Sequence, residues 1–421
     1  MAEPSRIDRA RDPEQNSMRI LIVSDVFPPR SGGSGESSAA LARALQARGH
    51  EPSVVTLSDE AATGRVEGLE VRRVSRGSKR QAVARLSEAI RESCASGNID
   101  LIHAQHWRSM QASVAAEAGR PLVVTVRDYW PVCQWSTRLA GDTVCPGCSY
   151  FRRIRCMARN RPSWWPLAPL LPLAPAVIGS ELANRHRLLQ AASAVVAVSE
   201  YVASTIEPWA REVVTVPNLL DRVGEYSAGF AFSAEIPERF LLFIGKLEPN
   251  KAADRVIPIV ERSGVGLPLL IAGEGQLVDR LRDQARASSV DVHLLGWVAA
   301  DTLRQMTAKA EVLLFPSRWQ EPLSRVLLEA IGVGGCVLAE PTGGTGDIIE
   351  HEVSGVLAKG DEQMAASLAR LDNQPELRAR LRGGALTKAA AFSASAVVAR
   401  IESVYRRVLD QDESIARAGS R

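Results

Sequence analysis

Short apolar runs, separated by stretches with helical periodicity, recur along most of this chain and limit the folds that it can adopt. The runs are almost wholly apolar, whereas a strand with one solvated face alternates polar and apolar residues. They form two series, 19–27, 53–57, 99–104, 122–126 and 194–198, and then 240–245, 267–272, 292–295, 312–315 and 336–339. Strands that are buried on both faces and joined by helices predict an α/β fold with two doubly wound parallel sheets.

The length of 421 residues suits two domains of about 200 residues each. The break between them is expected where two glycines and two flanking prolines interrupt the periodicity, near residue 218. The expected segments are a disordered lead-in at 1–17, a first Rossmann-like domain at 18–217, a linker at 218–236, a second domain at 237–392 and a final amphipathic helix at 393–417.

Composition and charge exclude several classes of protein. Hydrophobic residues make up 46% of the chain and charged residues 24%, which is typical of a globular protein. A net charge of +3 gives no reason to expect a nucleic-acid partner. Residues 1–17 lack a signal-peptide pattern, so we expect a reducing, cytoplasmic location and no disulfide framework. The weakly charged stretch 162–180 carries five prolines, which argue against a membrane-spanning helix.

A glycine-rich turn follows the first expected strand. Gly32 and Gly33 lie between that strand and a helical pattern, where backbone amides can approach a phosphate. The spacing is neither that of a dinucleotide fingerprint nor that of a P-loop. A structural turn and a ligand loop are about equally good interpretations of this segment.

Two lysines follow the first strand of the second domain. Lys246 and Lys251 can neutralise a diphosphate leaving group at the carboxyl end of that strand. Surface lysines are common, so a solvated loop is the alternative interpretation.

A pair of glutamates, Glu321 and Glu329, frames the start of a helix in the second domain. Pro322 fits the first helical position, which would place Glu321 at the cap and the free amides of Leu323 and Ser324 beside it. Glu329 is eight residues on, about 12 Å along a helix axis. Such carboxylates can hold sugar hydroxyls and stabilise an oxocarbenium ion. An ordinary helix start with one surface glutamate would have the same spacing.

These motifs together resemble a known family. The retaining glycosyltransferase family 4 has a signature similar to Phe315-Pro316-Ser317, Glu321-Pro322 and Leu327-Leu328-Glu329-Ala330. Lys246 and Lys251 lie where that family has a basic residue and a lysine. Further matches in order are Gly32-Gly33, Gly49-His50, Gly273-Glu274-Gly275, Gly343-Gly344 and Ser354-Gly355. The resemblance covers roughly residues 19–408.

The resemblance implies a GT-B fold and transfer from a UDP- or GDP-linked sugar to a saccharide or lipid-linked acceptor, with retention. The first domain would then take the acceptor, the second would take the donor, and the last helix would cross back to the first domain. By position, Lys246 and Lys251 would hold the diphosphate, Glu321 the donor sugar and Glu329 the ribose. Gly296 to Val298 would lie near the base, and Leu323 and Ser324 beside the donor. Gly32 and Gly33 would line the phosphate and acceptor side. Such enzymes usually need no metal.

One position departs from the family pattern. Arg127, in the segment Thr125-Val126-Arg127-Asp128-Tyr129-Trp130, stands where the family has a histidine near the reacting sugar. Arginine stays cationic and can hold a phosphate or polarise a hydroxyl, but it cannot accept a hydrogen bond. His103 and His106 are candidate substitutes, although ordinary loop or buried histidines are the better interpretation. The alternatives to an active transferase are a catalytically idle GT-B protein that binds nucleotide or supports a partner transferase and, less favoured, a sugar-nucleotide epimerase.

A segment at 133–180 carries clustered cysteines followed by arginines. Cys133, Cys145, Cys148 and Cys156 include one pair with metal-ligand spacing, so a structural zinc and four separate thiols are about equally good interpretations. Five arginines and the pair Trp164-Trp165 come next. Basic residues beside tryptophans favour slightly a peripheral position at the inner membrane surface over a proline-rich flap packed on its own domain.

Overall fold

The computed structural model describes residues 17–29, 33–96, 98–140, 143–160, 173–220, 223–224 and 236–419. These residues divide into two compact units. The first unit comprises residues up to Thr125, residues 191–194 and the chain from Ile401 onward; the second comprises 126–190 and 195–400. The predicted domain boundaries at 217 and 236 stay predictions.

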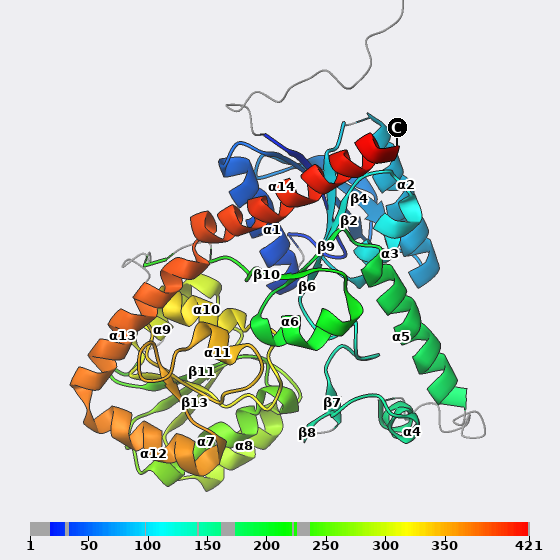
Figure 1. The fold of residues 1–421 in the computed structure, drawn as a ribbon. Helices are drawn as coiled ribbons and strands as arrows, with labels where there is room; N and C mark the ends of the chain where they lie inside the picture. Colours follow the sequence, from blue (N-terminus) through cyan, green and yellow to red (C-terminus); the bar gives the residue numbers. More distant parts are fainter. Residues whose placement is uncertain are drawn as a thin grey trace, which may run out of the picture. The chain divides into compact units, whose positions relative to one another are not determined.

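The first sheet has eight strands in the order β10-β9-β6-β5-β1-β2-β4-β3 (Figure 1). Central strand β1 pairs in parallel with β2 and β5, and β3 pairs antiparallel with β4 at one edge. The strands are β1 (Arg19–Ser24), β2 (Glu51–Ser58), β3 (Ala62–Val66), β4 (Leu69–Ser75), β5 (Leu101–Ala104), β6 (Leu122–Val126), β9 (Ala194–Ala197) and β10 (Val213–Thr215).

The second sheet has six strands in the order β13-β12-β11-β14-β15-β16, and all neighbouring pairs are parallel. Alternate residues such as Leu241 and Phe243 enter one apolar core, and Leu242 between them is equally buried. Burial on both faces explains why these strands are almost wholly apolar; the exception is edge strand β13, in which His293 is exposed. The strands are β11 (Leu241–Ile244), β12 (Leu269–Ala272), β13 (Val292–Gly296), β14 (Val312–Phe315), β15 (Val337–Ala339) and β16 (Val356–Leu357).

Helices connect the strands of both sheets. They are α1 (Gly33–Ala47), α2 (Lys79–Ser96), α3 (Trp107–Ala116), α4 (Tyr150–Asn160), α5 (Ala174–Gln190), α6 (Glu200–Ile206), α7 (Val256–Ser263), α8 (Val278–Ala287), α9 (Ala300–Lys309), α10 (Arg325–Gly332), α11 (Thr345–Ile348), α12 (Gly360–Asn373), α13 (Pro375–Ala389) and α14 (Ala394–Gly419). A short hairpin, β7 (Leu139–Ala140) and β8 (Thr143–Val144), precedes α4. The two doubly wound parallel sheets predicted from the apolar runs are confirmed.

The predicted start of the helix after Glu321 is wrong. Helix α10 begins at Arg325, and its cap is Ser324, whose hydroxyl accepts a hydrogen bond from Leu327 N at 3.4 Å. Serine is a preferred cap because its side-chain oxygen satisfies a free amide of the first turn. Glu321 and Pro322 therefore lie in the loop that precedes the helix, not at its cap and first turn.

The last helix is fixed within the first unit by buried polar contacts. Tyr405 on α14 hydrogen-bonds to Nδ1 of His103 at 2.6 Å, and the other ring nitrogen of His103 meets Thr125 at 2.7 Å. Glu402, one turn earlier, accepts from Arg48 and lies 3.0 Å from Nε2 of His50. Burial opposes ionisation of Glu402, but these hydrogen bonds outweigh it and lower its pKa.

Within the described part of the chain, no helix combines the length and the apolar character needed to cross a bilayer. Residues 161–172, which include Trp164 and Trp165, lie outside the described residues, as do Gly32 and the lead-in at 1–16.

Candidate active site

The second sheet has a cavity of about 630 Å³ at the carboxyl ends of β11, β12 and β13. Ligands of open parallel sheets bind at this edge. Lys246 and Val298, which are two of the predicted donor contacts, line the cavity. Trp297, in the segment predicted to lie near the base, also lines it and is 74% exposed. The full lining is Ile244, Gly245, Lys246, Glu248, Ala272, Gly273, Glu274, Gly275, Trp297, Val298 and Leu303.

Glycines let the loops after β11 and β12 approach each other at this cavity. Gly273 has φ +145°, and a Cβ there would lie 1.9 Å from the carbonyl oxygen of Gly245. A Cβ at Gly275 would lie 2.5 Å from the carbonyl oxygen of Leu247. Only glycine fits both positions, so backbone, rather than side chains, forms this wall of the cavity.

Lys251 forms an ion pair with Glu321 in the loop that precedes α10. Its Nζ lies 2.6 Å from Glu321 Oε1, and Ser317 Oγ donates to the same oxygen at 2.8 Å. The lysine nitrogen also lies 4.9 Å from the ring centroid of Trp319, within reach of a cation–π attraction. Glu321 is only 2% exposed, and its carboxylate accepts from a lysine and a hydroxyl.

The backbone around Glu321 is fixed by a glycine pair that follows β15. Gly344 N donates to the carbonyl oxygen of Glu321 at 2.7 Å, and Gly343 N donates to Oε1 of Gln320 at 2.9 Å. A Cβ on Gly344 would lie 2.4 Å from the carbonyl oxygen of Pro322. These glycines therefore position the loop that carries the carboxylate.

The segment after β6 also contacts this loop. Arg127 donates from Nη1 to the side-chain oxygen of Asn218. Tyr129 donates from its hydroxyl to the carbonyl oxygen of Gln320 at 2.6 Å. Trp319 donates from Nε1 to the carbonyl oxygen of Thr137 at 2.7 Å. Burial raises the pKa of Tyr129, so its hydroxyl stays a proton donor at neutral pH.

The remaining predicted site residues have the following places. Glu329 lies on α10 and accepts from Nε of Arg325 at 2.7 Å, while Leu323 and Ser324 are buried in the loop and cap before it. Gly296 ends β13 with φ +66° and accepts from Gly273 N at 2.8 Å. Gly33 begins α1, and its carbonyl oxygen accepts from Ser37 Oγ at 2.8 Å.

Sequence reasoning missed the residues that support Glu321. Ser317, Trp319, Gln320 and Tyr129 all contact it or its loop. Ser317 and Tyr129 belong to the two segments that the family resemblance singled out, so proximity to those motifs was the available signal. Tyr129 and Trp319 have partners 191 and 182 residues away in the chain, too far for spacing alone to indicate them.

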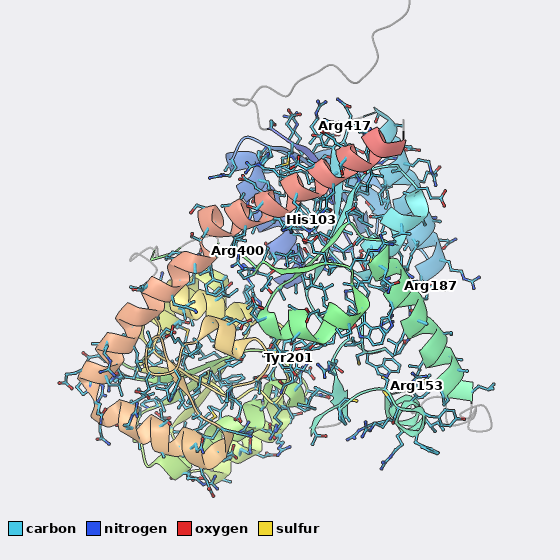
Figure 2. The ribbon with its side chains drawn as sticks, viewed as in Figure 1. His103, Arg153, Arg187, Tyr201, Arg400 and Arg417 are labelled. Atoms are coloured by element: carbon cyan, nitrogen blue, oxygen red, sulfur yellow. The ribbon has the colours of Figure 1, made fainter. Side chains whose placement is uncertain are left out.

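A second group of polar residues lies at the carboxyl ends of β1 and β5 in the first unit. Ser109 N donates to Asp25 Oδ1 at 2.9 Å, and Asp25 N donates to His106 Nδ1 at 3.3 Å. Burial raises the pKa of Asp25, against the opposing effect of its hydrogen bonds to Ser109 and the charge of Arg108. His103 is a core histidine bonded to Tyr405 and Thr125, and Figure 2 labels its position.

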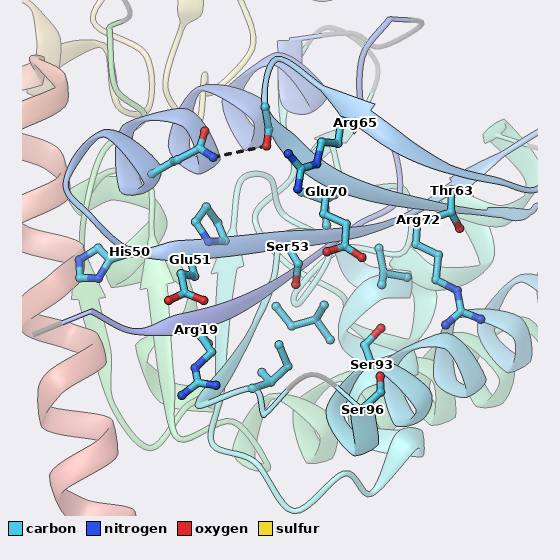
Figure 3. Close-up of a pocket in the computed structure, with 17 residues that line it drawn as sticks. Arg19, His50, Glu51, Ser53, Thr63, Arg65, Glu70, Arg72, Ser93 and Ser96 are labelled. Atoms are coloured by element: carbon cyan, nitrogen blue, oxygen red, sulfur yellow. Dashed lines mark hydrogen bonds between the residues drawn. The ribbon is translucent and has the colours of Figure 1, made fainter. Parts of the chain in front are cut away.

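The first unit has a separate polar cavity of about 470 Å³ (Figure 3). Arg19, Glu51 and Ile99, which begin or precede β1, β2 and β5, line it. It therefore lies near the amino ends of these strands, the edge opposite to the one at which parallel sheets bind ligands. This position distinguishes it from the candidate active site.

The clustered cysteines are free thiols. Trp135 donates from Nε1 to Cys156 Sγ at 3.1 Å, and Arg138 N donates to Cys133 Sγ at 3.4 Å. Burial and the neighbouring sulfurs of Cys133, Cys145 and Cys156 raise the pKa of Cys148 to about 11. Among the described residues, no three or more histidine, cysteine or carboxylate side chains are grouped to hold a metal. The zinc site stays a prediction.

Two parallel-sheet Rossmann-like domains, one with a glycine-walled cavity at its strand ends, define the GT-B class of proteins. Family models match both halves of the chain: the "Glycosyl transferase 4-like domain" at residues 32–218 and "Glycosyl transferases group 1" at residues 231–386. The two models together span both halves of the chain, which is therefore a glycosyltransferase with the GT-B fold.

Individual relatives agree with this assignment. D-inositol 3-phosphate glycosyltransferase of Thermobispora bispora is 28% identical over 75% of this chain and 72% of its own length. An uncharacterized glycosyltransferase of Methanocaldococcus jannaschii is 38% identical, but the match spans only 28% of this chain and 31% of that protein. The Anabaena protein HepE, crystallised with UDP, has the same fold: its TM-score is 0.69 at 18% identity, over 93% of this chain and all of that one.

Proposed function

We propose that this protein transfers a hexose-type sugar from a UDP- or GDP-linked donor to a saccharide or lipid-linked acceptor, with retention at the anomeric carbon, in the synthesis of a cell-surface polysaccharide or glycolipid. The observation that carries the proposal is the pairing of Lys251 with the buried Glu321, in loops that follow β11 and β14 of the sheet whose strand ends form the cavity. A buried carboxylate held by a lysine and a serine is suited to bind sugar hydroxyls in one fixed orientation.

The donor would lie along the carboxyl edge of the second sheet. Lys246 lines the cavity. Lys251 lies outside the lining, at the end of the short turn 249–251 in the same loop, so this loop offers two cations for the diphosphate. Trp297, exposed at the same cavity, offers a surface for a base. Glu329 remains the proposed ribose contact, and Leu323 and Ser324 remain proposed donor contacts.

The reaction breaks the bond between the anomeric carbon and the diphosphate oxygen. The diphosphate takes the electron pair, and the lysines stabilise its developing charge. The acceptor hydroxyl oxygen bonds to the anomeric carbon, and its proton leaves with the diphosphate or to solvent. Glu321 stabilises the positive charge that develops on the sugar ring. Because two lysines supply charge at the diphosphate, we propose that turnover requires no metal.

A direct test is turnover of a panel of UDP- and GDP-linked hexoses by the purified protein, followed as release of the nucleoside diphosphate. The anomeric configuration of the product, read by NMR, is expected to match that of the donor. An inverted product would contradict the retaining mechanism, and a product that is an isomer of the donor would favour an epimerase.

A second candidate function, binding without turnover, is favoured by Arg127. This cation occupies the position of a histidine in the resembling family and is already engaged by Asn218. The variant Arg127→His separates the two functions, because it restores a neutral acceptor without changing the donor cavity. Turnover that appears only in this variant would identify the natural protein as a binding or partner-supporting protein. Loss of turnover in the variant would give Arg127 a role in the reaction.

A further inference from the structure

Helices α4 and α5 contact each other (Figure 1). Met157 of α4 packs with Ile178 and Leu182 of α5. Arg153 of α4, labelled in Figure 2, donates to the carbonyl oxygens of Cys148 and Pro175, both at 3.0 Å. These contacts fix which side of α4 faces α5.

The opposite side of α4 is basic and carries one large exposed aromatic ring. Successive helical residues are about 100° apart, so Phe151, Arg152, Arg155 and Arg159 lie within an arc of about 100°, away from Arg153 and Met157. We call these four residues the outer face of α4. All four are exposed, and Phe151 is 76% exposed.

The charge of this region is strongly one-sided. From Thr143 to Ser180 the sequence contains five arginines and neither aspartate nor glutamate. On the neighbouring helix, Glu181 is paired with Arg185 at 3.2 Å. Over the described residues, no ion pair joins Arg152, Arg155 or Arg159 to a carboxylate. The outer face therefore presents its full positive charge to solvent.

Other exposed apolar side chains lie at the start of α4 and near the start of α5. Tyr150 is 56% exposed, and its ring stands edge-on to that of Phe151 with centroids 5.5 Å apart. Leu173 and Val177, four residues apart at the start of α5, are 57% and 56% exposed. Phe151 shares one side of α4 with three exposed arginines, and an exposed aromatic ring among cations is typical of a surface that binds a partner.

We propose that the outer face of α4 docks on the surface of an anionic lipid bilayer. Guanidinium groups pair with lipid phosphates, and an aromatic ring beside them enters the interface between headgroups and acyl chains. A soluble acidic polymer would satisfy the arginines but would leave Phe151 in water. A bilayer covers both, so the composition of this face favours lipid. The inference concerns attachment and does not depend on the sugar-transfer proposal.

Cosedimentation of the full chain with vesicles tests the proposal without any activity measurement. We expect binding to vesicles of phosphatidylcholine with phosphatidylglycerol, and little binding to phosphatidylcholine alone. The triple variant R152E/R155E/R159E should weaken binding about 100-fold or more, since each basic residue near an anionic surface contributes roughly fivefold. Phe151→Ser should weaken it about 10-fold.

Matched controls separate this face from the general charge of the protein. Arg380→Glu on α13 is an arginine-to-glutamate change away from the outer face and is the control for the charge reversals. Ile415→Ser on α14 removes an apolar side chain that is 72% exposed and is the control for Phe151→Ser. Both should bind as the wild type does, and all variants should keep its melting temperature. Equal binding to both vesicle types, or unchanged binding by the triple variant, would overturn the proposal. Binding that is insensitive to Phe151→Ser and fully displaced by soluble polyphosphate would assign the face to an acidic polymer instead.

Discussion

Lys251 Nζ and Glu321 Oε1 lie 2.6 Å apart although 70 residues separate them in the chain. The lysine follows β11 and the glutamate follows β14, and these strands are neighbours in the second sheet. Pairing the two groups fixes the orientation of the carboxylate. Glu321 is buried and Lys251 is partly exposed, so removing the lysine would leave a buried carboxylate with one partner fewer and should also lower the stability of the fold.

Replacing either member of this pair should abolish most turnover. For Lys251→Ala and Glu321→Gln we expect kcat/KM to fall about 10²- to 10³-fold, as for loss of one group that stabilises charge in a transition state. Lys309→Ala, at an exposed position on α9, is the matched control and should leave the rate unchanged. Near-wild-type rates in both site variants, with circular dichroism unchanged, would remove the proposed site.

Ser317→Ala should weaken the site without removing a charge. The variant loses one hydrogen bond to Glu321 Oε1, which is worth about 1–3 kcal/mol because the acceptor is charged. We expect a reduced free energy of unfolding in urea and a smaller kcat, with donor KM changed less. Ser414→Ala, whose hydroxyl bonds only to an exposed carbonyl of α14, should change neither quantity.

Gly273→Ala should be far more damaging than its size suggests. The new Cβ would lie 1.9 Å from Gly245 O, at a backbone φ that side chains rarely adopt. We expect loss of nucleotide binding, measured by calorimetry, and a lower melting temperature. Gly383→Ala on α13 meets nothing within 4 Å and should raise stability by about 0.5–1 kcal/mol. Equal effects of the two changes would contradict the described cavity wall.

The attachment of α14 should depend on pH through Glu402. Its folded-state pKa is lowered, so the stabilisation is present above the ordinary carboxyl value of 4.5 and is lost as the pH falls below it. Glu402→Gln should lower the melting temperature at pH 7 and should reduce the difference in stability between pH 7 and pH 4. If the variant loses as much stability between pH 7 and pH 4 as the wild type does, protonation of Glu402 is not the cause of that loss.

Most of the fold could be predicted because its strands are continuous apolar runs. All ten predicted strands are present, since most of their residues are apolar and few polar positions interrupt the runs. β3 was missed because four of its five residues are exposed, and the two-residue β16 is too short to show a pattern. The helix after Glu321 was misplaced because Pro322 satisfies the rule for a first helical residue, whereas the capping hydroxyl belongs to Ser324.

The site could be predicted only in part. Spacing and resemblance indicated Lys246, Lys251 and Glu321. In the structure Lys246 lines the cavity at the strand ends, and Lys251 forms an ion pair with Glu321. The bond from Tyr129 to Gln320 joins residues 191 positions apart, and no local pattern indicates it. Such support depends on tertiary structure, and a single sequence does not encode it in any periodicity.

Calorimetric titration of the purified chain with UDP and with GDP tests the central claim most directly. We expect one of the two to bind with a stoichiometry of one and a micromolar dissociation constant, equivalent to about −8 kcal/mol. Lys246→Ala, which removes a cation that lines the cavity, should weaken that binding about 10-fold or more. If neither nucleotide binds, or if the variant binds as tightly as the wild type, the cavity at the carboxyl ends of β11 to β13 is not a nucleotide-sugar site.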